Sequence, residues 1–278
     1  VLANPSCRFY SLEMGNAITS FARETIKETT KLINEQGYDV LYGDTDSVFV
    51  DFHSGSADEA EALGLKTAKA INEHFRDKVK KSYGRSSYLE LEFEKLFRVL
   101  MLPRVRGGEH GAKKRYAGLA MKDGKEEVKV TGMEFVRSDW TELSKRFQEE
   151  LLWRVFYKKE VASYIKKIVE GIRKGEYDDM LVYRKSIRKD LDQYTKTTPP
   201  HVKAARMLPK LESTIVEYYM TTNGPEPVKI AKEKGTRLDY DHYIEKQIKP
   251  IADTVLNLFS LSFDEVIRNS KQKSLFDY

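Results

Sequence analysis

The chain has 278 residues, 40% apolar side chains, a single cysteine (Cys7) and a formal net charge of +5 at pH 7. This length allows one large or two modest domains with apolar cores. One cysteine excludes an intramolecular disulfide, and no apolar run approaches membrane-spanning length, so we expect a cytoplasmic protein with no membrane partner.

The first predicted elements are a helix, a hairpin and a second helix. Apolar residues recur at three- and four-residue intervals from Ser11 to Ile33, which predicts a long amphipathic helix ending near Gly37. The stretch Val40–Val50, VLYGDTDSVFV, has strand-like residues on both sides of Gly43 and Asp44, which predicts a β-hairpin. A further helix is predicted over Asp58–Lys80, where it would cover one face of a sheet.

Two carboxylates, Asp44 and Asp46, lie at the predicted tip of the hairpin. Residues two apart on an extended chain point to the same face, so we expect both side chains to project together. Protonation of one carboxylate, or cations between the two, would relieve their repulsion, and carboxylate oxygens suit Mg²⁺. The alternative is a solvated turn in which one Asp caps the backbone, and spacing alone favours that alternative.

Strand-like alternation and a basic run follow the second helix. Leu89, Leu91 and Phe93 alternate with glutamates, which predicts a half-buried strand over Tyr88–Phe93. After a loop over Pro103–Ala112, the next strand begins with Lys113, Lys114, Arg115 and Tyr116. A basic run with an aromatic residue indicates contact with nucleic acid, whereas a solvated strand end is the alternative interpretation.

The second half of the chain has a helical pattern. Helices are predicted over Trp140–Phe156, Glu160–Gly175 and Val202–Tyr219. Basic residues gather before the last of these helices and at its start, at Arg184, Lys185, Arg188, Lys189, Lys196, Lys203 and Arg206. Thr195, Thr197, Thr198 and His201 add hydroxyl and imidazole donors. We expect phosphate contacts here, including backbone amides at the start of the helix after Pro200; a salt-laced helical surface is the alternative.

The sequence around the two aspartates resembles a known family. Tyr42–Ser47, YGDTDS, is similar to the third palm motif of family B DNA polymerases. Further segments resemble that family in the expected order: RFYSLEMGNAITSFARETI, LELEFEKLF, KKRYAG, TGMEFVRSDW, PPHVKAAR and DYDHYIEKQIKPIADTVL. The resemblance covers essentially the whole chain, and the last two segments lean toward the bacterial DNA polymerase II branch.

The resemblance implies an α+β fold in two parts with a tail. Residues 1–130 would form the C-terminal part of a polymerase palm, an antiparallel sheet with helices on one face. Residues 131–270 would form a mostly α-helical thumb, and residues 271–278 a flexible tail that binds the sliding clamp.

The same resemblance implies a chemistry and its partners. Two Mg²⁺ ions would promote transfer of a nucleotide from dNTP to a primer 3′-hydroxyl, with Asp46 as bridging ligand, Asp44 beside it and Glu94 near the metals. Primer-template DNA would contact the Lys113–Tyr116 run and the thumb residues Arg188, Thr197, His201, Lys203 and Arg206. The family's fingers motif and a further essential Asp lie upstream, so we expect this chain alone to be inactive without the N-terminal polymerase portion.

The last residues, Gln272, Leu275 and Phe276, form Q-x-x-L-F, which is similar to the peptide by which bacterial polymerases bind the sliding clamp. A frayed terminus that folds back onto the thumb is the alternative.

Other functions stay open at this point. A DNA-binding subunit of a split polymerase would carry the same basic thumb, and an inactivated paralogue would act as a DNA-binding module. A reverse transcriptase or cyclase palm also presents paired acids, but neither accounts for the later segments. The resemblance places the protein at the nucleoid.

Overall fold

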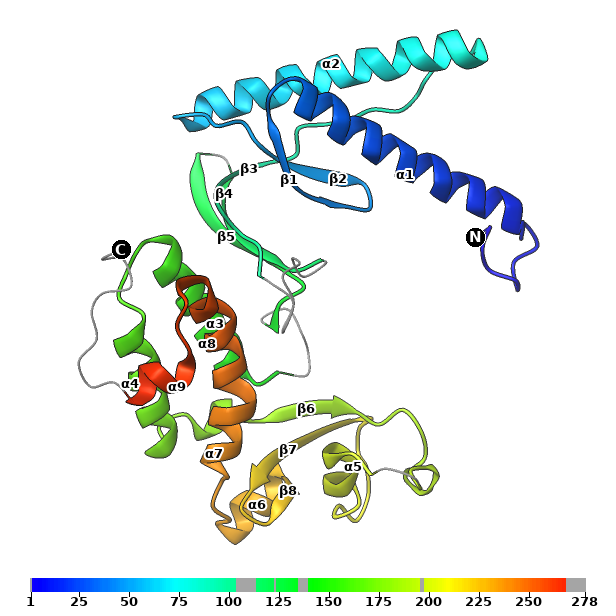
Figure 1. Ribbon diagram of the computed structural model, residues 1–278. Coiled ribbons are helices and arrows are strands. Elements are labelled where there is room, and N and C mark those ends of the chain that lie inside the picture. Colours follow the sequence, from blue (N-terminus) through cyan, green and yellow to red (C-terminus); the bar gives the residue numbers. More distant parts are fainter. Residues whose placement is uncertain (1, 104–113, 123, 135–139, 196–197, 269–278) are drawn as a thin grey trace. The chain divides into compact units, whose positions relative to one another are not determined.

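The computed structural model describes residues 2–103, 114–122, 124–134, 140–195 and 198–268 (Figure 1). The chain divides into two compact units: unit 1 comprises Val1–Arg98 with Met121–Lys125, and unit 2 comprises Val99–Ala120 with Glu126–Tyr278. Helices alternate with short sheets, and the pairs β1–β2, β6–β7 and β7–β8 are antiparallel. The predicted α+β class is confirmed.

The two long helices of unit 1 begin where the sequence predicts. Helix α1 spans Leu12–Glu35, and the side chain of Ser11 accepts a hydrogen bond from the amide of Met14. Helix α2 spans Ala57–Tyr83; Ser56 caps its start, and Gly84 ends it in the left-handed conformation. Both predicted helices are confirmed.

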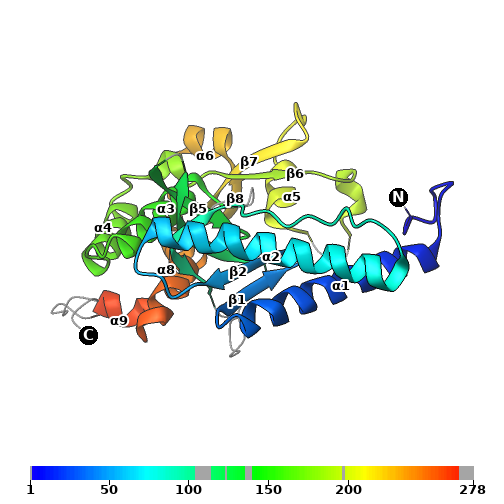
Figure 2. The ribbon, with the colours of Figure 1, turned by 90° about the horizontal axis from the view of Figure 1, so that it is seen from above.

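These helices pack on the hairpin of β1 (Asp39–Asp44) and β2 (Ser47–Asp51). Ile33 of α1 and Ile71 and Phe75 of α2 form a small buried core, against which hairpin valines are partly buried. Glu28 of α1 also contacts two polar side chains of α2, His74 at 2.8 Å and Lys78. Figure 2 shows α1 and α2 running along the hairpin.

The predicted strand over Tyr88–Phe93 is wrong, although the segment has the expected alternation of exposure at its end. Instead of pairing with a strand, Leu91 donates its amide to Asn72 Oδ1 at 2.7 Å, and Asn72 Nδ2 donates to the Leu91 carbonyl at 2.9 Å. Phe93 packs so closely on α2 that a Cβ on Gly64 would lie 2.5 Å from its ring. A helix side chain therefore satisfies backbone groups that a strand would otherwise pair.

Three strands follow this segment: β3 (Leu96–Met101), β4 (Tyr116–Lys122) and β5 (Lys125–Thr131). They form one sheet in the order β3-β4-β5, and the division between the two units falls within them.

Helices surround the main core of unit 2. The predicted helices near residues 140–156 and 160–175 are confirmed as α3 (Glu142–Phe156) and α4 (Ala162–Arg173). Later in the chain come α7 (Tyr240–Tyr243), a π-helical turn (Ile244–Ile248), α8 (Lys249–Leu256) and α9 (Phe263–Arg268). Fully buried side chains of this core include Phe147, Leu151, Ile165, Ile251 and Val255.

The predicted helix over Val202–Tyr219 is wrong beyond its first turns. Helix α5 covers only Pro200–Ala205, and residues Ile215–Thr221 form strand β7. That strand lies between β6 (Tyr183–Ser186) and β8 (Gly224–Pro227), and α6 (Val228–Lys234) follows. Val216 and Tyr218 are buried on either side of exposed Glu217, a period of two that suits a strand rather than a helix.

Among its described residues, unit 2 also contains the 3₁₀ turns η2 (Asp178–Met180), η3 (Leu191–Gln193) and η5 (Asn257–Phe259). Within the described ranges, no helix is long and apolar enough to cross a membrane.

Candidate functional site

The hairpin tip is a tight turn that lies two residues later than the sequence predicts. Asp44 pairs with Ser47, so Thr45 and Asp46, rather than Gly43 and Asp44, form the loop. The amide of Asp46 donates to the Asp44 carbonyl at 2.5 Å, and the Ser47 hydroxyl donates to the same oxygen at 3.3 Å. Thr45 takes a left-handed φ of 49°, which is uncommon for a β-branched residue and typical of functional turns.

The turn, rather than the strand period, places the two carboxylates. Because Thr45 is not extended, the same-face rule for residues two apart does not apply across it. Asp44 is partly buried, like Val40 and Tyr42 on the same strand, whereas Asp46 is exposed. The Thr45 hydroxyl donates to Asp44 Oδ1 at 3.0 Å and helps to orient this carboxylate.

Aromatic rings support the hairpin beneath its tip. Tyr42 and Phe49 face each other across the two strands with ring centroids 5.6 Å apart, and Phe49 contacts Phe97 at 5.9 Å. These contacts fix the strands that end in the acidic turn.

Mg²⁺ fits the donor set at the tip. This ion is commonly held by one or two carboxylates, with water and phosphate oxygens in its other positions, so Asp44 and Asp46 are suitable ligands. Among the residues that the structure describes, no group of three or more His, Cys, Asp or Glu side chains is placed to hold a metal. Glu94, the third acid suggested by the sequence, is ion-paired with Lys95 at 2.5 Å.

The basic run before β4 is partly built into the fold. Arg115 Nη2 pairs at 2.7 Å with Glu134, a carboxylate that is only 5% exposed, and Gln148 donates to the other oxygen of Glu134 at 2.9 Å. A buried carboxylate without its cation would be costly, so this arginine has a structural task. Lys114 is exposed and Tyr116 is half-buried, while Lys113 lies outside the described residues. Contact of this run with DNA stays a prediction.

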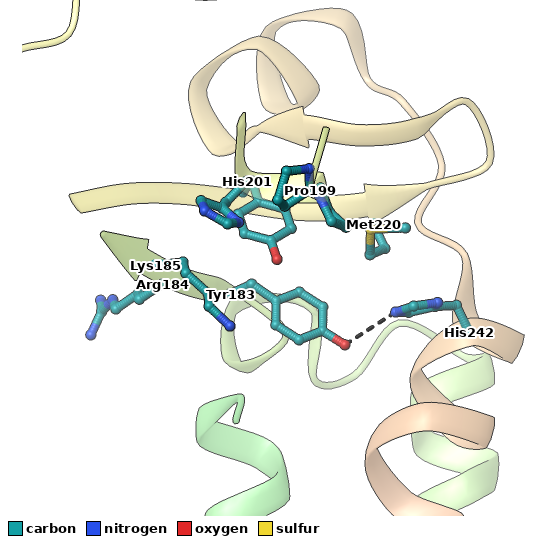
Figure 3. A pocket seen from close by; sticks show the side chains of 9 residues that line it. Tyr183, Arg184, Lys185, Pro199, His201, Met220 and His242 are labelled. Atoms are coloured by element: carbon teal, nitrogen blue, oxygen red, sulfur yellow. Dashed lines mark hydrogen bonds between the residues drawn. The ribbon is translucent and has the colours of Figure 1, made fainter. Parts of the chain in front are cut away.

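A second group of the predicted residues surrounds a pocket of about 270 Å³ in unit 2 (Figure 3). Its lining comes from β6, β7 and the starts of α5 and α7: Tyr183, Arg184, Lys185, Pro199, Pro200, His201, Tyr218, Met220 and His242. His201 and Pro199 lie on one side of the pocket, and Tyr183 and His242 lie on the other. The Tyr183 hydroxyl and His242 Nε2 are hydrogen-bonded at 3.1 Å.

The histidines of this pocket are neutral near pH 7. Burial, and then the charge of Lys185, lowers the pKa of His201, which is 9% exposed. Burial is also the main reason why the pKa of His242 is lowered. Positive charge therefore comes from the exposed side chains Lys185 and Arg184, the second of which pairs with Glu217 at 2.7 Å.

Two of the amides at the start of α5, which the sequence suggested as phosphate donors, are already used within the helix. The amides of Val202 and Lys203 both donate to the Pro199 carbonyl, at 3.0 and 3.1 Å. The Lys203 side chain is exposed on this helix. Arg206 Nη2 donates to the carbonyls of Leu191 and Tyr194 at 2.8 and 3.3 Å.

Thr197 and the tail residues Gln272, Leu275 and Phe276 lie outside the described residues. Other residues that shape the sites escaped sequence reasoning: Asn72, Glu134, Gln148, Tyr183 and His242. Tyr183 had a usable signal, because it directly precedes the basic pair Arg184 and Lys185.

Comparisons with known proteins give one consistent result. The family model described as "DNA polymerase family B" matches residues 2–259. The chain is 36% identical to DNA polymerase II of Escherichia coli (strain K12), an alignment that covers 95% of this chain and 35% of that protein. It is 29% identical to DNA polymerase 2 of Aeropyrum pernix, over 99% of this chain and 32% of that protein.

A solved structure agrees with the sequence matches. The family B DNA polymerase from the hyperthermophilic archaeon Pyrobaculum calidifontis superposes with a TM-score of 0.62 at 27% identity, covering 91% of this chain and 31% of that chain. The chain thus spans about a third of the length of these three relatives.

Proposed function

This chain belongs to DNA polymerase family B, and we propose that it forms the palm end and thumb of an enzyme that adds deoxynucleotides to a primer 3′-hydroxyl. The observation that carries this proposal is the YGDTDS stretch, which lies on a hairpin turn that presents Asp44 and Asp46 above an aromatic base. Because the chain spans about a third of these relatives, the complete activity would belong to a longer assembly.

Asp44 and Asp46 would hold Mg²⁺ in this proposal. When bound there, Mg²⁺ would supply positive charge to offset that of the triphosphate and would lower the pKa of the attacking hydroxyl. The partial burial of Asp44 and its bond from Thr45 support a fixed ligand, and the exposure of Asp46 supports a ligand that shares its ion with substrate.

DNA would be held by the cations of unit 2. Lys185 lines the pocket, Arg188 lies on the segment after β6 and Lys203 lies on α5. All three are exposed, which supports contacts to phosphates without sequence preference. His201 would contribute a hydrogen bond rather than a charge, because its pKa is lowered.

The assembly would have two further partners. On α1, Met14, Ile18 and Phe21 lie at helical spacing and are each 56–57% exposed, which supports packing against the remaining polymerase portion. By its sequence, the tail 271–278 would bind a sliding clamp. We retain residues 1–130 as palm and 131–270 as thumb, and we expect the 278-residue chain to need that remaining portion for nucleotide addition.

Primer extension tests the catalytic assignment. In the complex restored with the remaining polymerase portion, Asp46→Asn should abolish nucleotide addition and leave DNA affinity equal or higher, because a charge that repels phosphate is lost. Asp39→Asn removes an exposed charge at the other end of the same hairpin and should leave extension intact. Extension that survives Asp46→Asn would refute the assignment.

One alternative keeps a specific observation in its favour. Lys185, Arg188 and Lys203 belong to unit 2, whereas Asp44 and Asp46 belong to unit 1. A DNA-binding module without catalysis would therefore need only the three cations. DNA binding that is unaffected by restoring the remaining portion, with no extension under any metal condition, would favour that alternative.

A further inference from the structure

The segment after β6 is attached to unit 2 at several points. The amide of Ile187 donates to the Thr214 carbonyl at 2.7 Å, and Leu191 packs on the small core formed by Ala204, Ala205, Val216 and Tyr218. Between these anchors, Arg188 and Lys189 are exposed. The placement of these two cations therefore depends on what holds residues 188–194.

Arg206 holds that segment from the end of α5. Its Nη2 atom carries two hydrogens, and both are donated, one to the Leu191 carbonyl at 2.8 Å and one to the Tyr194 carbonyl at 3.3 Å. The two acceptors lie at the start of η3 and immediately after it. One guanidinium nitrogen thus ties both ends of the η3 turn to the end of α5.

Tyr194 links the Arg206 contact to Arg188. Its hydroxyl accepts a hydrogen bond from the backbone amide of Arg188 at 3.3 Å. The sequence of contacts runs from Arg206 to the Tyr194 carbonyl, and from the Tyr194 hydroxyl to the backbone of Arg188. Arg206 therefore restrains the position of Arg188 without touching its side chain.

We propose that Arg206 is a positioning residue of the DNA surface, acting through Arg188, and not itself a phosphate contact. This inference rests on the proposed DNA binding of unit 2. It changes the interpretation of the basic cluster: Lys203 and Arg188 would meet phosphate, whereas Arg206 would fix the loop that carries Arg188.

The chemistry of arginine is essential to this role. A guanidinium is planar and rigid and presents its donors in a fixed arrangement, whereas the lysine ammonium ends a flexible chain that is one bond shorter than the path from Cα to an arginine Nη atom. Arg206→Lys keeps the positive charge but loses the geometry that spans the two carbonyls. If Arg206 acts by its charge near phosphate, Arg206→Lys should keep the affinity for DNA. If Arg206 acts by holding residues 188–194, Arg206→Lys should lower that affinity.

The first measurement is hydrogen exchange of the 278-residue chain without DNA. In both Arg206→Lys and Arg206→Gln, the amides of Arg188, Gln193 and Tyr194 should exchange faster, because each donates within this segment. The amide of Thr222, which donates to the Arg237 carbonyl elsewhere in unit 2, is the internal control and should be unchanged. Unchanged exchange at all three amides in both variants would overturn the proposal.

The second measurement is the salt dependence of affinity for primer-template DNA. Loss of one phosphate contact should flatten the slope of log K against log salt by about 0.9, or about 3.5-fold in affinity over a fourfold salt range. Arg206→Lys should cause this loss, and adding Arg188→Gln should cause no more, whereas adding Lys203→Gln should flatten the slope again.

The outcomes separate the two ideas. Independent effects of Arg206→Lys and Arg188→Gln, or a wild-type slope in Arg206→Lys, would overturn the positioning role while leaving DNA binding in place. No salt-dependent binding by the wild-type chain would overturn the proposed function and this inference together. The exchange data would still show whether Arg206 restrains residues 188–194.

Discussion

Replacing Gly132 with alanine should displace the basic run before β4, which is remote in the sequence but adjacent in the fold. Gly132 follows β5 with a φ of +62°, and a Cβ at this position would lie 1.9 Å from the backbone oxygen of Lys114. That oxygen belongs to the chain immediately before Arg115, so it cannot rotate away like the end of a flexible side chain. The two backbones must separate by about 1.1 Å to restore the 3.0 Å below which real contacts are essentially absent.

Two costs combine in this variant. A left-handed conformation costs an alanine about 1–2 kcal/mol, and displacing packed backbone adds about 1–3 kcal/mol, as other overpacking substitutions do. Gly235 at the end of α6 provides the matched control, because it has a φ of +61° in the same unit and a Cβ added there would meet nothing within 4 Å. Gly235→Ala should therefore carry only the conformational cost.

Urea unfolding followed by tryptophan fluorescence measures the difference. Both tryptophans, Trp140 and Trp153, belong to unit 2, so the signal reports the unit that contains Gly132 and Gly235. Gly132→Ala should lower the free energy of unfolding by about 1–3 kcal/mol more than Gly235→Ala does. The affinity of Gly132→Ala for DNA should also fall, because Lys114 and Arg115 move. Equal losses in the two variants would show that the close approach to Lys114 contributes nothing.

Three further outcomes are expected. Asn72→Ala should lower the free energy of unfolding by about 1–3 kcal/mol, because two hydrogen bonds to the extended segment are lost; circular dichroism in urea measures this, and a loss no greater than that of Asn16→Ala, in exposed α1 surface, would contradict it. The lowered pKa values of His201 and His242 mean that the unfolded chain binds protons first as pH falls below about 6.5. Unit 2 should therefore be less stable at pH 5.5 than at pH 7.5, and His201→Gln should reduce that difference in the urea midpoint; an unchanged difference would show that this histidine does not contribute. Deleting Gln272–Tyr278 should abolish binding to the cognate sliding clamp in a calorimetric titration while DNA affinity stays the same, and equal clamp binding by both chains would assign the tail no such role.

Local patterns in the sequence determined the family, the α+β class and the main elements of the chain. The long helices α1 and α2 follow from apolar spacing and from Ser11, Ser56 and Gly84 at their ends, all of which are encoded within a few residues. The hairpin follows from two β-branched runs around YGDTDS. The alternation of apolar and acidic residues over Tyr88–Phe93 led to a wrong strand prediction. A period of two indicates which side chains are exposed, but a strand also needs a partner to pair with.

Tertiary structure alone decided which polar side chains serve the fold and which remain at the surface. Asn72 reaches Leu91 across 19 residues, Arg115 reaches Glu134 across 19, and Arg206 reaches Leu191 across 15. An arginine in a basic run has the same local sequence signal whether its partner is a phosphate or a carbonyl of its own chain. The sequence therefore identified the basic segments, but only the fold could separate Lys203, which is exposed, from Arg206, because hydrogen-bond partners distant in the chain leave no period to detect.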